Sequence, residues 1–161
     1  MKFLNSSFFL KIVLILLSLP IIALAIFGFP FIAEAVAESF PQIGTLEVLV
    51  MGYLYVITFP YFLALFQSYR LLTLIDGKET FSDQAINALK VIKICGFWIA
   101  GMFLIAMPLV VYMGSVHNAF EIVIAGSVII IISIVISAFA FVLQSLLDDV
   151  VNSKKENELT V

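Results

Sequence analysis

The chain has 161 residues, of which 63% are hydrophobic and 12% are charged, with a formal net charge of −3. Soluble proteins contain about 45–50% apolar and about 25% charged residues, so this composition excludes an ordinary soluble domain and indicates a protein solvated by lipid. It also argues against a nucleic-acid-binding surface, because the charges are mixed in sign and form no basic run.

Four stretches without Asp, Glu, Lys or Arg are each long enough to cross a bilayer. They cover residues 12–33, 48–69, 94–120 and 122–147. About 20 apolar residues span the hydrocarbon core as a helix. Helices are expected because backbone amides in lipid need internal partners, and these stretches lack the alternation of barrel strands. The sequence predicts one all-α membrane domain over residues 1–161, a four-transmembrane-helix bundle with spans of about 8–32, 47–75, 94–113 and 120–147.

All eight basic residues fall on one side of these four spans. The first and third connections contain none, and positive residues stay on the cytoplasmic side of a membrane. We therefore expect a multi-pass membrane protein with both termini in the cytoplasm. The eight residues are Lys2, Lys11, Arg70, Lys78, Lys90, Lys93, Lys154 and Lys155.

The first span has two interpretations. A basic start, an apolar run and the small residues around Glu34 suit a cleaved signal peptide. The uncharged run is longer than the 7–15 residues, roughly, of a signal h-region, so we favour a retained anchor. Pro20 is expected to bend this helix.

The second span is the most polar of the four. Thr58, Tyr61 and Gln67 lie around Pro60, which is expected to kink the helix. The three side chains either line a polar cavity or pack against neighbouring helices, and packing is the favoured interpretation.

The connection over residues 71–93 begins with a turn at Asp76-Gly77. Thr80 or Ser82 is expected to cap a helix with Asp83 in its first turn. No Gly or Pro follows until Gly96, so a cytoplasmic helix over about 82–93 should continue into the third span. The fourth helix is expected to end at residues 148–149, with the last residues forming a solvated tail.

No motif in the chain supports catalysis. Metal-ligand clusters, nucleophile elbows and phosphate-binding loops are lacking, so we expect no enzyme activity, cofactor or metal. Cys95 is interpreted as an apolar filler and His117 as a solvated loop residue. Ion-coupled carriers usually hold an ionisable residue at mid-membrane, and none of these spans has one.

Two segments of the chain resemble a known family. The connection contains the short sequences Ile-Asp, Phe-Ser, Ala-Leu-Lys and Ile-Lys in this order. Near its C-terminus the chain contains Glu-Asn-Glu-Leu-Thr. This pattern resembles the bacterial membrane proteins called domain of unknown function 2975. The resemblance implies four helical spans in the bacterial cytoplasmic membrane and no settled activity. Its members are often encoded beside small helix-turn-helix regulators, which implies a regulatory or protective role. The matching residues are Ile75, Asp76, Phe81, Ser82, Ala88, Leu89, Lys90, Ile92, Lys93 and 156–160.

Two functional hypotheses follow. The first is a non-enzymatic regulatory, sensing or protective protein, with a docking surface at Asp76, Phe81, Ser82 and Lys90 for a cytosolic helix-turn-helix regulator or another membrane protein. The same residues also suit a loop anchored on lipid headgroups. The alternative function is a pore or carrier for a small or lipid-like molecule, with a cavity at the level of the three span prolines, Pro20, Pro60 and Pro108. The lipid bilayer is the one partner that the composition requires, direct nucleic-acid binding is not expected, and homo-oligomerisation stays open.

Overall fold

The computed structural model describes residues 2–160, with side chains from Ser7 onward, and this part of the chain is helical apart from short loops. Four helical segments are long and apolar enough to cross a membrane, which confirms the all-helical membrane fold. The side chain of Lys2 lies outside the described part. The elements are α1 (Lys2–Ala23), η1 (Leu24–Gly28, a π-helix), α2 (Phe29–Ser39), α3 (Leu46–Asp76), α4 (Asp83–Val116) and α5 (Phe120–Leu159).

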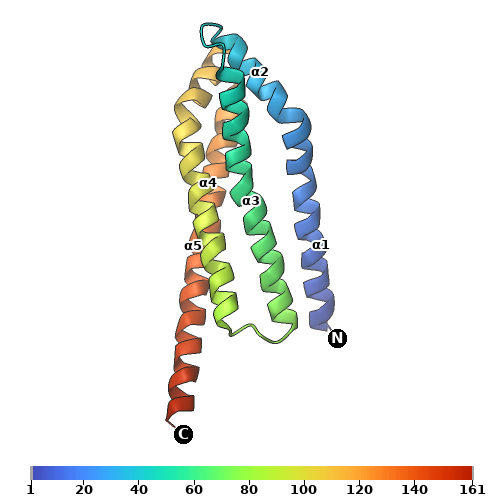
Figure 1. Ribbon diagram of the computed structural model, residues 1–161, viewed down its shortest axis with the longest axis vertical. Helices are drawn as coiled ribbons and strands as arrows, with labels where there is room; N and C mark the ends of the chain where they lie inside the picture. Colours follow the sequence, from blue (N-terminus) through green and yellow to red (C-terminus); the bar gives the residue numbers. More distant parts are fainter. Residues whose placement is uncertain (1, 161) are drawn as a thin grey trace.

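The helices run up and down, so their ends gather at two poles (Figure 1). We call one pole the basic end; α1 and α4 begin there and α3 and α5 finish there. The opposite pole, the acidic end, holds the loops over residues 40–45 and 117–119. The described basic side chains all lie toward the basic end. The positions of the basic residues relative to the four spans predict this.

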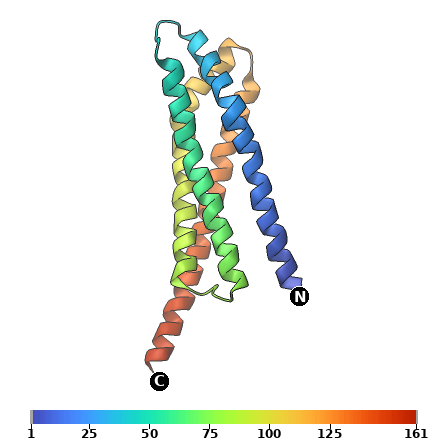
Figure 2. The ribbon, with the colours of Figure 1, turned by 45° about the vertical axis from the view of Figure 1, so that its right-hand side comes forward.

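The four spans form an open row instead of a closed bundle. α4 packs against both α3 and α5, while α1 and α2 pack against α3. Within residues 2–160, α1 makes no extensive contact with α4 or α5, and α3 lies between α1 and α4 (Figures 1 and 2). A closed bundle is not required, because lipid tails solvate apolar helix faces as well as another helix does.

Lipid-facing side chains cover much of this open row. Phe27, Ile105 and Phe139 are each about 70% exposed or more, at 77%, 72% and 69%. A soluble protein rarely exposes such a continuous apolar surface. The exposed aromatic and aliphatic residues are therefore consistent with hydrocarbon as the surrounding solvent.

The first span contains an irregularity that its sequence did not predict. The helix passes from α1 through the π-turn η1 into α2, and the Phe29 amide donates to the carbonyl of Leu24, five residues earlier. In an α-helix that amide would serve Ala25. Pro30, the next residue, has no N–H. The carbonyl of Ala25 thus has no amide from either residue, and the Tyr55 hydroxyl of α3 donates to it at 3.1 Å.

Two predictions about helix ends had different outcomes. The helix that begins beside Ser82 runs without interruption into the third span, as α4, which confirms the continuous helix. The expected end of the last helix at residues 148–149 is wrong, because α5 continues to Leu159. No Gly or Pro occurs after Gly126, so the backbone has no residue that would stop the helix.

Candidate functional site

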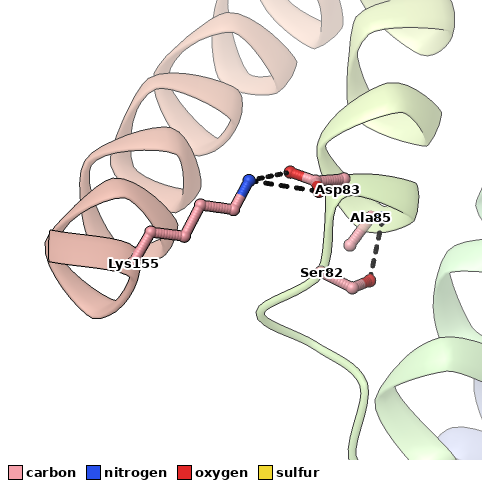
Figure 3. A network of polar contacts seen from close by, with 4 residues as sticks. All are labelled: Ser82, Asp83, Ala85 and Lys155. Atoms are coloured by element: carbon pink, nitrogen blue, oxygen red, sulfur yellow. Dashed lines mark hydrogen bonds and ion pairs between the residues drawn. The ribbon is translucent and has the colours of Figure 1, made fainter. Parts of the chain in front are cut away.

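The candidate site at the basic end is built on the N-terminus of α4. Ser82 has extended backbone angles, φ −126° and ψ 155°, and its hydroxyl accepts a hydrogen bond from the Ala85 amide at 3.3 Å (Figure 3). Asp83 places a negative charge in the first turn, where the helix dipole favours it. The cap predicted from the sequence is therefore confirmed at Ser82, and it fixes where the loop over residues 77–82 enters the helix.

We expect Ser82→Ala to loosen the first turn of α4. Loss of an N-cap hydroxyl costs about 1 kcal/mol, so amides over residues 83–86 should exchange with deuterium about fivefold faster. Hydrogen exchange of the protein in mild detergent measures this. Ser82→Asp is the matched control, because it restores a capping oxygen and should restore slow exchange. Unchanged exchange in Ser82→Ala would show that the cap does not hold the turn.

Beyond their uncharged stretches, α4 and α5 stay packed together. We call residues 83–93 of α4 and 148–159 of α5 the terminal helix pair. Ala85 and Ala88 are fully buried, at 0% and 1% exposure, and Val151 of α5 is buried as well. The small alanines let the two helices approach at these residues, whereas residues 152–159 of α5 are exposed and α5 extends past the start of α4 (Figure 1).

Charged side chains link the two members of the terminal helix pair. Lys155 Nζ lies 3.2 Å from Asp83 Oδ1 (Figure 3). Both side chains are mostly exposed, so this ion pair adds little stability. At the base of the pair, Lys93 donates to Gln144 Oε1 at 2.9 Å. These two contacts set the register of α5 against α4, but they add little to the stability of the fold.

The four predicted docking residues have different roles in the structure. Asp76 faces α1, where its carboxylate lies 2.6 Å from Lys11 Nζ. Ser82 is used as the helix cap. Phe81 is 52% exposed, and Lys154 of α5 lies 5.8 Å from its ring centre. Lys90 is exposed on α4. The accessible part of the predicted surface is therefore Phe81 and Lys90, together with lysines of α5 that the sequence interpretation assigned to a tail.

The three predicted cavity residues do not share a polar space. Thr58 donates to the carbonyl of Leu54 in its own helix, and Tyr61 donates to the carbonyl of Leu17 in α1, at 2.8 and 2.9 Å. Gln67 is buried, at 9% exposure, and its Oε1 has no hydrogen-bond partner in the described part of the chain. Two of the three polar groups are thus used to hold backbone carbonyls, as the packing interpretation expects.

Two apolar grooves run along the sides of α4, and neither is lined by the three predicted residues. The α3–α4 groove has a volume of about 410 Å³ and the α4–α5 groove about 230 Å³. Of the span prolines, only Pro60 lines one of these grooves. The α3–α4 groove is formed by Val56, Phe59, Pro60, Leu63, Ile94, Cys95 and Trp98, and the α4–α5 groove by Leu89, Ile92, Val135, Ile136, Phe139, Ala140 and Leu143.

Cys95 and His117, the two remaining candidate residues, pack or bond within the fold. Cys95 is buried between α3 and α4. His117 Nε2 lies 3.2 Å from the Ser39 hydroxyl, a contact that joins the end of α2 to the loop over residues 117–119. Among the described residues no group of three His, Cys, Asp or Glu side chains is placed to hold a metal ion.

Sequence comparison identifies the family. The family described as "Protein of unknown function (DUF2975)" matches residues 31–161. The chain belongs to this family. It is also similar to the uncharacterized membrane protein YoaS of Bacillus subtilis (strain 168), with 44% identity over 156 residues, which are 97% of this chain and 98% of the relative. No solved structure matches the chain. The resemblance seen in residues 75–93 and 156–160 is thus confirmed for DUF2975, and the terminal helix pair lies inside the matched region.

Proposed function

We propose that this DUF2975 protein is a non-enzymatic docking protein of the bacterial cytoplasmic membrane, with a regulatory, sensing or protective role. Both termini and the terminal helix pair face the cytoplasm in this proposal. The count of basic residues supports the orientation, because all eight lie on one side of the spans. The partner is a cytosolic protein, and the resemblance makes a small helix-turn-helix regulator the first candidate.

The observation that supports docking is the packed state of the terminal helix pair. A segment that only tethers spans to water needs no second helix against it, yet Ala85, Ala88 and Val151 are buried where α4 and α5 continue past their uncharged stretches. Beside this rigid pair Phe81 presents half of its ring. Binding energy at protein interfaces is concentrated in such aromatic anchors ringed by polar residues.

The charges around Phe81 suit recognition of a partner rather than of lipid alone. Lys154 approaches the ring from α5, and Asp83, two residues after Phe81, is paired with Lys155. Glu156 and Glu158 follow on the last turn of α5. Mixed charges of this kind select the register and identity of a protein partner, whereas an anionic membrane selects positive charge only.

Capture of the tagged protein from its own cells in mild detergent, followed by mass spectrometry, tests the proposal. We expect one cytosolic protein at a constant ratio to the bait. Phe81→Ala with Lys90→Ala should reduce its recovery at least tenfold, because the aromatic anchor and a neighbouring charge are lost. Both side chains are exposed, so the membrane insertion of the variant should be unchanged.

Phe120→Ala with Glu121→Ala is the matched control. It removes an exposed phenylalanine and a charge at the acidic end, on the opposite side of the membrane in this proposal. The partner should be retained. The docking proposal is contradicted if both variants lose the partner equally or if the Phe81 variant retains it fully. It is also contradicted if the tagged protein is recovered without a cytosolic protein.

A further inference from the structure

The α3–α4 groove is apolar along its length and ends near two basic residues. Its seven lining residues are apolar, and its volume of about 410 Å³ lies within the range of about 300–1,000 Å³ typical of small-molecule sites. Phe59 and Trp98 flank it and are 70% and 54% exposed. The groove extends from Val56 to Leu63 along α3, about 10 Å. It offers hydrocarbon surface along its length and no polar partner.

Two cations lie on the same face as the groove, toward the basic end. Lys90 precedes Ile94 by four residues and Trp98 by eight, so it lies on the helix face that lines the groove. Arg70 follows Leu63 by seven residues on α3 and shares its face in the same way. Both are exposed. The groove therefore opens at one end onto an arginine and a lysine from its two walls.

Within the described part of the chain, the Arg70 side chain makes one hydrogen bond. Its Nη2 donates to Gln84 Oε1 of α4 at 3.3 Å, which holds the side chain across the α3–α4 boundary. A guanidinium has five N–H donors in a planar fork that suits phosphate oxygens. The contact with Gln84 leaves four of these donors for a ligand.

A third polar group lies on α3 between the groove and Arg70. Gln67 follows Leu63 by four residues and precedes Arg70 by three, so the three share a face. The Oε1 atom of Gln67 is buried and has no hydrogen-bond partner in the described part of the chain. A buried acceptor of this kind is costly when unpaired. Gln67 thus marks the end of the apolar stretch on this face of α3, one turn before Arg70.

We propose that the α3–α4 groove binds one anionic phospholipid. An acyl chain occupies the groove, and the phosphate lies between Arg70 and Lys90. This site shares Lys90 with the docking surface but lies on the α3–α4 face, and it goes beyond the proposed function because it assigns the protein a lipid ligand.

Charge argues for a lipid and against a second copy of the chain in this groove. Two copies related by a twofold axis normal to the membrane would bring their basic ends to the same level. Arg70 and Lys90 of one copy would then face the same cations of the other, and such like-charge contacts are unfavourable. An anionic headgroup neutralises both side chains at the level where the uncharged stretch of α3 ends.

The chain's single tryptophan provides a probe inside the site, because Trp98 lines the groove. The protein is reconstituted in phosphatidylcholine vesicles that contain a low mole fraction of phosphatidylglycerol with brominated acyl chains, which quench tryptophan on contact. We expect severalfold stronger quenching than with the same fraction of brominated phosphatidylcholine. Arg70→Gln with Lys90→Gln should make the two lipids equal, since only the headgroup preference is removed.

Lys78→Gln with Lys154→Gln is the charge-matched control and should keep the preference, because neither residue lies on the groove face. Equal quenching of the unmodified protein by both lipids overturns the proposal. So does an undiminished preference in the Arg70/Lys90 variant. If neither lipid quenches Trp98 and Phe59→Cys forms a disulfide between two copies, a second chain covers the groove. That outcome overturns the proposal as well. The single variants Arg70→Gln and Lys90→Gln replace the double variant if it fails to insert.

Discussion

Alanine at Gly96 is expected to lower the free energy of unfolding by about 1–3 kcal/mol, the usual cost of overfilling a packed interior. A Cβ atom at this position would overlap the Ser137 hydroxyl of α5 and would lie 3.0 Å from the carbonyl oxygen of Ser133. Ser137 is fully buried, and its hydroxyl already donates to the Ser133 carbonyl at 2.8 Å. Neither group can move away without opening the contact between α4 and α5.

Gly101 provides the matched control for this substitution. It lies five residues further along α4, and a Cβ atom there would meet no atom within 4 Å. Because alanine favours helix over glycine, Gly101→Ala should be neutral or slightly stabilising. Unfolding in mixed micelles of mild detergent and SDS measures both variants. If Gly96→Ala is as stable as Gly101→Ala, the close approach of α4 and α5 at Gly96 is wrong.

Phenylalanine at Tyr55 is the second substitution with a large expected effect. It removes the hydroxyl that serves the Ala25 carbonyl in η1 but keeps the ring, which packs edge-on against Phe29 at 5.4 Å between ring centres. An unpaired carbonyl out of contact with water costs about 1–3 kcal/mol, and lipid offers no replacement donor. We expect a loss of that size in the free energy of unfolding, together with faster hydrogen exchange at the Phe29 amide.

Tyr112→Phe controls for the loss of a tyrosine hydroxyl in a span. The Tyr112 ring packs on Phe40 at 5.2 Å, and within the described residues its hydroxyl makes no hydrogen bond. This variant should match the unmodified protein. A stability loss shared by both variants would point to a general effect of tyrosine hydroxyls, and it would remove the argument that Tyr55 stabilises the π-turn.

The terminal helix pair shows how far local sequence signals reach. Ser82 could be identified as a cap because a hydroxyl before an acidic first turn serves the helix's own amides. The continuity of α4 followed from the lack of Gly and Pro before Gly96. The same signal was present in α5 after Gly126, but the charged residues after Leu147 were interpreted as a tail. Val151 is the buried residue in those last turns, and the exposed turns after it stay helical because no Gly or Pro stops the helix.

The candidate sites were harder to predict than the helices. Asp76 and Ser82 were grouped with Phe81 because they are close in sequence, yet the fold directs Asp76 to Lys11 on α1 and uses Ser82 as a cap. The α3–α4 groove was not predicted. Its walls come from segments more than thirty residues apart, and an apolar residue that lines a groove looks the same in sequence as one that faces lipid.

The membrane class, the four spans, the family and the grouping of the basic residues at one end can all be predicted from the sequence alone. Each of these depends on one segment at a time, because a helix in lipid satisfies its own backbone and needs only length and apolar composition. Which helices touch is seen in the tertiary structure alone. Each span exposes apolar residues on several faces, so hydropathy does not select neighbours, whereas the fit of small residues such as Gly96 against Ser137 does. The open row, the π-turn held by Tyr55 and the groove beside Arg70 and Lys90 all follow from that choice of neighbours.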